Sequence, residues 1–79
     1  MARIQGEVNR GVLRAVRIAG SEAALGLGLK VTQRTVSNWL HRSIPSYRMS
    51  EIVEWSQGAI KVKEFFMREH ASKLASEID

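Results

Sequence analysis

The strongest constraint on the fold of this chain is a set of apolar residues on both sides of a short polar turn. These residues are Leu25, Leu29, Val31, Val36 and Trp39. Ser21 is a good N-cap for a helix over about 22–28, and Thr32 is a candidate N-cap for another helix over about 33–41. The spacing predicts that these two short helices pack together across the turn and bury the five apolar side chains.

Further helices are predicted on either side of this pair. Before it, apolar residues recur at spacings of three or four and predict a first helix over roughly 6–18, which Gly20 is suited to end. These residues are Ile4, Val8, Val12, Val16 and Ala19. After it, Pro45 interrupts helical structure, and a fourth helix of about 46–57 is predicted to end at Gly58.

The last segment of the chain carries two competing patterns. Residues 60–63 alternate like a strand, whereas four later apolar residues repeat at helical spacing. These four are Met67, Ala71, Leu74 and Ile78. We predict a fifth helix over about 62–76. The chain is thus expected to be one all-α domain over 1–79 with four to five helices, in which 59–79 is a candidate oligomerisation segment.

Composition narrows the function classes. The chain has 79 residues and a net charge of +4. It contains no cysteine, and this absence excludes disulfides, thiolate metal sites and cysteine nucleophiles. Residues 1–48 hold eight basic and two acidic side chains, whereas residues 49–79 hold four basic and six acidic ones. This basic balance indicates a polyanionic partner that meets the first half of the chain. We expect a cytoplasmic protein, because no apolar run is long enough for a signal peptide or a membrane span.

The predicted helix over about 33–41 carries an unusual density of hydrogen-bonding groups. Its polar residues fall on the face opposite Val36 and Trp39; they are Gln33, Arg34, Ser37 and Asn38, and His41 continues that face. In the major groove of DNA, glutamine and asparagine pair with adenine and arginine pairs with guanine, while hydroxyls meet bases or phosphates. Two short helices of this kind predict a helix-turn-helix that reads double-stranded DNA.

The stretch GSEAALGLGLKVTQRTVSNWL, residues 20–40, resembles without gaps the Cro-like helix-turn-helix regulators of lambdoid phages and their YdaS-type prophage relatives. The similarity continues into IPSYRMSEIVEW, residues 44–55, which resembles the corresponding segment of the phage activator CII, so it covers residues 11–57. The resemblance implies a lambda-repressor-like domain that regulates transcription on operator DNA in a bacterial host cell. A Cro-like repressor is the expected function, with a CII-like activator or a YdaS-type toxin or antitoxin acting on protein partners as alternatives.

The resemblance also implies roles for individual residues. Thr32 would cap the recognition helix, and the base-reading positions would be Gln33, Arg34 and Asn38. Ser37, on the same face, is a further base-reading candidate and also a candidate for backbone contact. Expected contacts to the DNA backbone come from Thr32, Thr35 and His41, and, as nonspecific phosphate clamps, from Lys30, Arg42 and Arg48. For the arginines of the first helix, Arg10, Arg14 and Arg17, backbone contact and ordinary solvation are equally compatible with the sequence.

Three residues depart from the family pattern. Lys30 stands where the turn usually has glycine, and a left-handed lysine would cost on the order of 1 kcal/mol, so a differently shaped turn is expected. Gly26 replaces the usual alanine and still permits close helix approach, although it weakens the second helix. Glu22 stands where a phosphate-contacting glutamine is common, and it is left out of the site because it would repel phosphate.

The end of the chain suggests a second subunit. Phe65, Phe66 and Met67 in succession exceed what one face of a terminal helix can bury, so they are the candidate dimer interface. Two subunits would place two recognition helices on half-sites about one helical turn apart. An enzyme is not expected, because no metal-binding, phosphate-loop or paired-carboxylate motif is present, and neither cofactor, small-molecule substrate nor membrane partner is implied.

Overall fold

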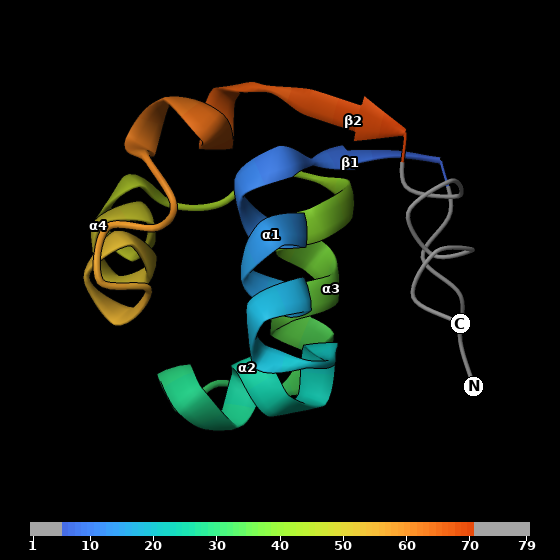
Figure 1. Ribbon diagram of the computed structural model, residues 1–79. Coiled ribbons are helices and arrows are strands. Elements are labelled where there is room, and N and C mark those ends of the chain that lie inside the picture. Colours follow the sequence, from blue (N-terminus) through green and yellow to red (C-terminus); the bar gives the residue numbers. More distant parts are fainter. Residues whose placement is uncertain (1–5, 71–79) are drawn as a thin grey trace.

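The computed structural model describes residues 6–70, which form a mostly helical domain with a small two-stranded antiparallel ribbon (Figure 1). In chain order the elements are β1 (Glu7–Asn9), α1 (Arg10–Ala19), α2 (Glu22–Leu29), α3 (Gln33–His41), α4 (Ser46–Trp55), the 3-10 helix η1 (Val62–Phe66) and β2 (Arg68–His70). Helices α1 and α3 lie side by side, α2 crosses one end of the pair, and the ribbon crosses the other end. The mostly helical domain with its four predicted helices is therefore confirmed, and the short ribbon is an addition that the all-α prediction did not include.

The helix ends follow from local capping groups. Ser21 Oγ accepts a hydrogen bond from the Ala24 N–H at 3.0 Å and starts α2, and Thr32 starts α3 in the same way. Gly20 ends α1 at φ 105°, a left-handed conformation that glycine adopts without strain. These three predicted boundaries are confirmed.

The first helix begins later than its apolar stripe predicts. Asn9 is the N-cap, and its side-chain oxygen accepts a hydrogen bond from the Val12 N–H at 3.1 Å. Residues 7–9 instead pair with β2, so that Val8 reaches the core from a strand. The periodicity cannot separate these cases, since Val8 is buried either way.

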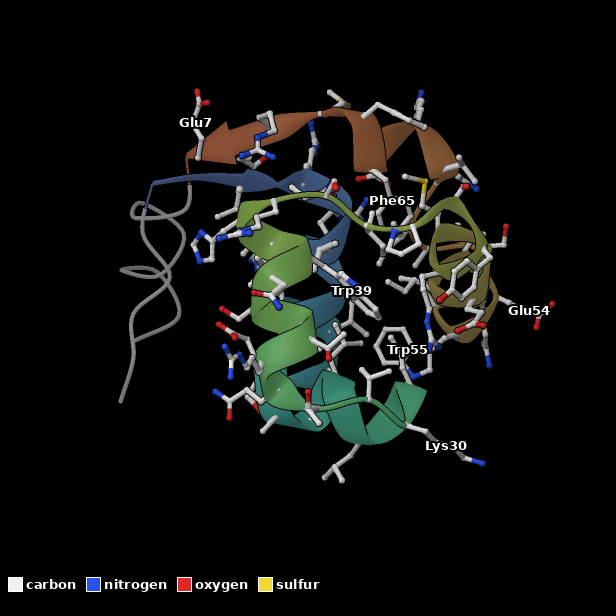
Figure 2. All side chains as sticks on the ribbon, turned by 180° about the vertical axis from the view of Figure 1, so that it is seen from behind. Glu7, Lys30, Trp39, Glu54, Trp55 and Phe65 are labelled. Atoms are coloured by element: carbon white, nitrogen blue, oxygen red, sulfur yellow. The ribbon has the colours of Figure 1, made fainter. Side chains whose placement is uncertain are left out.

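One core connects β1, the four helices and η1. It is made of the buried side chains Val8, Val12, Leu13, Ala15, Val16, Leu25, Val36, Trp39, Leu40, Ile44, Ile52, Ile60 and Phe65. Leu29, Val31 and Trp55 are partly buried against it, and Figure 2 shows Trp39 and Trp55 pointing toward the space between α3 and α4. All five apolar residues that bracket the turn thus contribute to the core.

The predicted fifth helix is wrong over residues 62–70. Residues Val62–Phe66 form a single 3-10 element and Arg68–His70 form β2, which pairs antiparallel with β1 in the register Val8 to Glu69. The Arg10 N–H donates to the Met67 carbonyl at 2.9 Å, so pairing with the start of the chain overrides the local helical pattern. Residues 71–76 of the predicted helix lie outside the described part.

Two buried polar side chains tie this last segment to α1. Asn9 Nδ2 donates to the Phe65 carbonyl at 2.6 Å. The Glu64 carboxylate accepts from Arg14 Nη1 at 2.6 and 2.7 Å and from the Lys61 N–H at 2.9 Å. These bonds fix where η1 ends and where the ribbon begins.

Within residues 6–70, every helix is too short or too polar to cross a lipid bilayer.

Candidate nucleic-acid interface

Helix α3 has a buried side and an exposed side. Val36, Trp39 and Leu40 are buried against the core. The opposite side is exposed, and it carries Arg34, then Asn38 one turn later and His41 two turns later. We call the exposed side the outward face of α3; it consists of Gln33, Arg34, Ser37, Asn38 and His41, of which only Ser37 is partly buried.

The outward face has no internal polar partners within residues 6–70. None of its side chains forms a hydrogen bond or ion pair with another described residue. Two carboxamides, a guanidinium, a hydroxyl and an imidazole are therefore presented together to the surroundings. The predicted base-reading residues Gln33, Arg34, Ser37 and Asn38 are brought onto one surface.

The turn before α3 is tight. Lys30 adopts φ 61° and ψ 42°, so the lysine takes the left-handed conformation and the expectation of a differently shaped turn is wrong. The Val31 N–H donates to the Gly26 carbonyl at 2.8 Å. A Cβ on Gly26 would lie 2.7 Å from the Val31 carbonyl oxygen, which is too close, so a larger residue there would force the backbone of the turn to shift. The close approach expected at Gly26 is confirmed.

The threonines at the start of α3 are engaged with each other. Thr32 Oγ1 accepts a hydrogen bond from the Thr35 N–H at 3.1 Å and lies 2.9 Å from Thr35 Oγ1. The capping role of Thr32 is thereby confirmed, and both hydroxyls take part in the cap. Contact of these two side chains with a DNA backbone stays a prediction.

The C-terminal end of α3 is cationic. His41 and Arg42 are exposed, and Arg42 is the residue that follows the last turn of the helix. Burial raises the pKa of the Glu22 carboxyl on α2, while the nearby His41 imidazole acts to lower that pKa. Glu22 is thus a half-buried neighbour of the outward face.

Two predicted phosphate clamps lie away from the outward face. Arg48 Nη1 donates to Glu51 at 2.6 Å, and its guanidinium carbon lies 5.8 Å from the centre of the Trp39 ring. Since Trp39 is on the buried side of α3, the structure does not bring Arg48 to the outward face. Figure 2 shows Lys30 pointing into solvent at the far end of α2.

The arginines of α1 divide into two groups. Arg14 donates to Glu64, and Arg10 Nε lies 3.6 Å from Glu64 and 3.5 Å from Glu69. These two arginines are therefore ion-paired with carboxylates of the same chain. Arg17 is exposed, and its contact with a DNA backbone stays a prediction.

The predicted subunit interface is corrected at one residue. Phe65 is only 4% exposed and packs in the core, where Figure 2 shows it pointing inward, so it is not available to a second chain. Phe66 and Met67 are 72% and 41% exposed and stay candidates. Consecutive apolar residues in a 3-10 turn point to different sides, which is why only one of the two phenylalanines is buried.

Sequence reasoning missed Asn9, Glu64 and Arg68. Asn9 and Glu64 are bonded to partners 56 and 50 positions away, and no local pattern identifies such pairs. Arg68 was missed because its segment was assigned to a helix. It lies on β2, and its guanidinium donates to the backbone carbonyl of Arg42.

Comparison with known proteins found no match among protein families, curated proteins or solved structures. Within residues 6–70, no group of three or more histidine and carboxylate side chains is placed to hold a metal ion.

Proposed function

We propose that the protein is a sequence-specific DNA-binding transcriptional regulator in which α2, the turn and α3 form a helix-turn-helix. The proposal rests above all on the outward face of α3, whose polar side chains have no partner within residues 6–70. A helix anchored from behind by Val36 and Trp39 fits the major groove of B-DNA. The resemblance to Cro-like regulators of lambdoid phages supports the same assignment.

In this proposal the residues divide by what they contact. Gln33, Arg34 and Asn38 read base edges, and Ser37 lies beside them within reach of bases or phosphates. His41 and Arg42 contact phosphates at the end of α3. A regulator of this kind most simply represses by occupying a promoter-proximal operator; a bound protein that instead recruits polymerase would be CII-like.

The proposal extends to two copies of the chain. One α3 helix reads only a few base pairs, so affinity for an operator benefits from a second subunit on an adjacent half-site. We propose that a second copy covers Phe66 and Met67, which are exposed apolar side chains at the start of the ribbon.

The experiment measures binding of labelled duplexes by fluorescence anisotropy at several salt concentrations. One duplex is selected by the protein from a randomised library, and the other is a scrambled version of it. Arg34→Ala should weaken binding to the selected duplex by roughly 5- to 150-fold, the equivalent of about 1–3 kcal/mol, with a much smaller effect on the scrambled duplex. Arg42→Ala should weaken binding to both duplexes alike and flatten the salt dependence by about one unit of slope.

Lys63→Ala is the matched control, because Lys63 is an exposed cation on η1, which packs against α1 and α4. Equal behaviour of the Arg34 and Arg42 variants would contradict the assignment of base-reading residues. A wild-type protein that binds no duplex at low salt would overturn the proposed function itself.

A further inference from the structure

At the end of α3, the ribbon brings the side chain of Arg68 to the backbone of Arg42. Arg68 Nη1 donates to the Arg42 carbonyl at 3.3 Å, and Arg68 Nη2 donates to the Glu7 carbonyl at 3.3 Å. Arg68 thus bridges the C-terminal end of α3 and the first strand of the ribbon. Both arginine side chains are exposed.

This arrangement changes the electrostatics of the helix end. The last carbonyls of a helix carry partial negative charge and repel anions. Here the Arg68 guanidinium donates a hydrogen bond to the Arg42 carbonyl and brings a full positive charge to the end of the helix. Within residues 6–70, no carboxylate forms an ion pair with Arg42 or Arg68. A guanidinium held at the backbone of a second arginine, with no carboxylate paired to either residue in the described part of the chain, favours an external anion.

The ribbon holds Arg68 in a fixed place. Arg68 pairs with Asn9 in the β1–β2 register, and Asn9 is itself bonded to the Phe65 carbonyl at 2.6 Å. The Glu64 carboxylate anchors the preceding turn on Arg14. The Glu7 side chain points outward from the end of the ribbon (Figure 2), and the Glu7 backbone carbonyl accepts a hydrogen bond from Arg68.

We infer that Arg68 and Arg42 form a phosphodiester-binding pair, by which the β1–β2 ribbon extends the DNA contact beyond the end of α3. The inference rests on the proposed function and adds to it a second structural element that meets the duplex. A helix of nine residues is about 14 Å long, close to the roughly 12 Å width of the major groove. When α3 lies in the groove, its end and the adjoining ribbon therefore lie near the phosphates of the groove edge.

The test uses the full chain, the two duplexes described above and four variants. Arg68→Ala should weaken binding to the selected and scrambled duplexes alike, by about tenfold at 50 mM salt, and should lower the salt slope by about 0.9. Arg68→Gln should show the same loss, since it keeps a polar side chain with N–H donors but lacks the charge. Arg68→Lys should restore most of the affinity and the slope. Lys63→Ala should leave both near the wild-type values.

The outcomes separate this inference from the proposed function. If Arg68→Ala matches Lys63→Ala while Arg34→Ala still loses discrimination, the ribbon contact is wrong and the proposed function stands. If Arg68→Lys binds as weakly as Arg68→Ala, or Arg68→Gln as tightly as wild type, Arg68 acts by holding the backbone and the phosphate contact is overturned. If the wild-type chain binds no duplex, both proposals fail together.

Discussion

Glu64 is the residue whose charge contributes most clearly to the fold. Its side chain is 7% exposed and ion-paired with Arg14, whose side chain is 38% exposed. Burial acts to raise the pKa of Glu64, but the hydrogen bonds from Arg14 and from the Lys61 N–H, with the charges of Arg14 and Arg10, lower it below its usual 4.5. The ionised form is therefore the one that stabilises the folded state.

We predict that Glu64→Gln lowers the free energy of unfolding at pH 7 by about 2 kcal/mol, less than the roughly 3–5 kcal/mol of a fully buried pair because Arg14 is partly solvated. Urea denaturation monitored by circular dichroism measures the change. Glu51→Gln is the control, since the Arg48–Glu51 pair lies at the surface, where water screens it and it should contribute little to stability. Equal effects of the two substitutions would contradict the structural role of Glu64.

The lowered pKa of Glu64 also predicts that the stability of the protein depends on pH. The contribution of Glu64 is fully present above the unfolded-state value of about 4.5 and is lost as the pH falls through the lower folded-state pKa. Wild-type stability should therefore fall below pH 4.5 more steeply than the stability of Glu64→Gln. Denaturation curves between pH 6 and about pH 2.5 compare the two proteins, and parallel losses would show that other groups account for the acid sensitivity.

Lys30 stores backbone strain. Because its φ is 61°, Lys30→Gly should raise the free energy of unfolding by about 1 kcal/mol. Gln57, at φ 57°, offers an independent case, and Gln57→Gly should stabilise the protein to a similar degree. Thermal and urea denaturation check both variants. Unchanged or reduced stability in both would contradict the left-handed geometry.

At the level of elements, the packing of α2 against the turn depends on Gly26 more than helix propensity suggests. Alanine usually stabilises a helix by about 0.5–1 kcal/mol over glycine, but a Cβ at Gly26 would collide with the Val31 carbonyl. We predict that Gly26→Ala nevertheless destabilises the protein by about 1–3 kcal/mol. Ala23→Gly, at an exposed position of α2, measures the propensity term alone. A stabilising Gly26→Ala would show that the turn is not this tight.

Helices that begin and end at capping residues could be predicted from the sequence, whereas strands that form by pairing with a distant segment could not. Ser21, Thr32 and Gly20 mark helix ends through groups within a few residues, so α2 and α3 were predicted to within a residue or two. β2 exists because residues 68–70 pair with residues 7–9, and the sequence around Arg68 does not predict that pairing. For the same reason the outward face of α3 was predictable from the sequence, whereas the position of Arg68 beside Arg42 was not.

At the level of the whole molecule, the proposed dimer has a specific test. Removal of the chain after Gly58 would delete Ile60 and Phe65 from the core, so truncation would test folding instead of assembly. We predict that Phe66→Ser combined with Met67→Ser converts a dimer to a single chain in sedimentation experiments. Leu27→Ser, at an apolar side chain of α2 that is 82% exposed, should leave the dimer intact. A wild-type protein that sediments as one chain at high concentration would contradict the interface.

The central claim, that the outward face of α3 enters duplex DNA, is tested most directly by nuclear magnetic resonance during titration with a duplex at low salt. We predict that the side-chain amide signals of Gln33 and Asn38 and the backbone amides of residues 33–42 shift most. Amides of α4 should move little. Unchanged signals along α3, or shifts confined to another element, would contradict the claim.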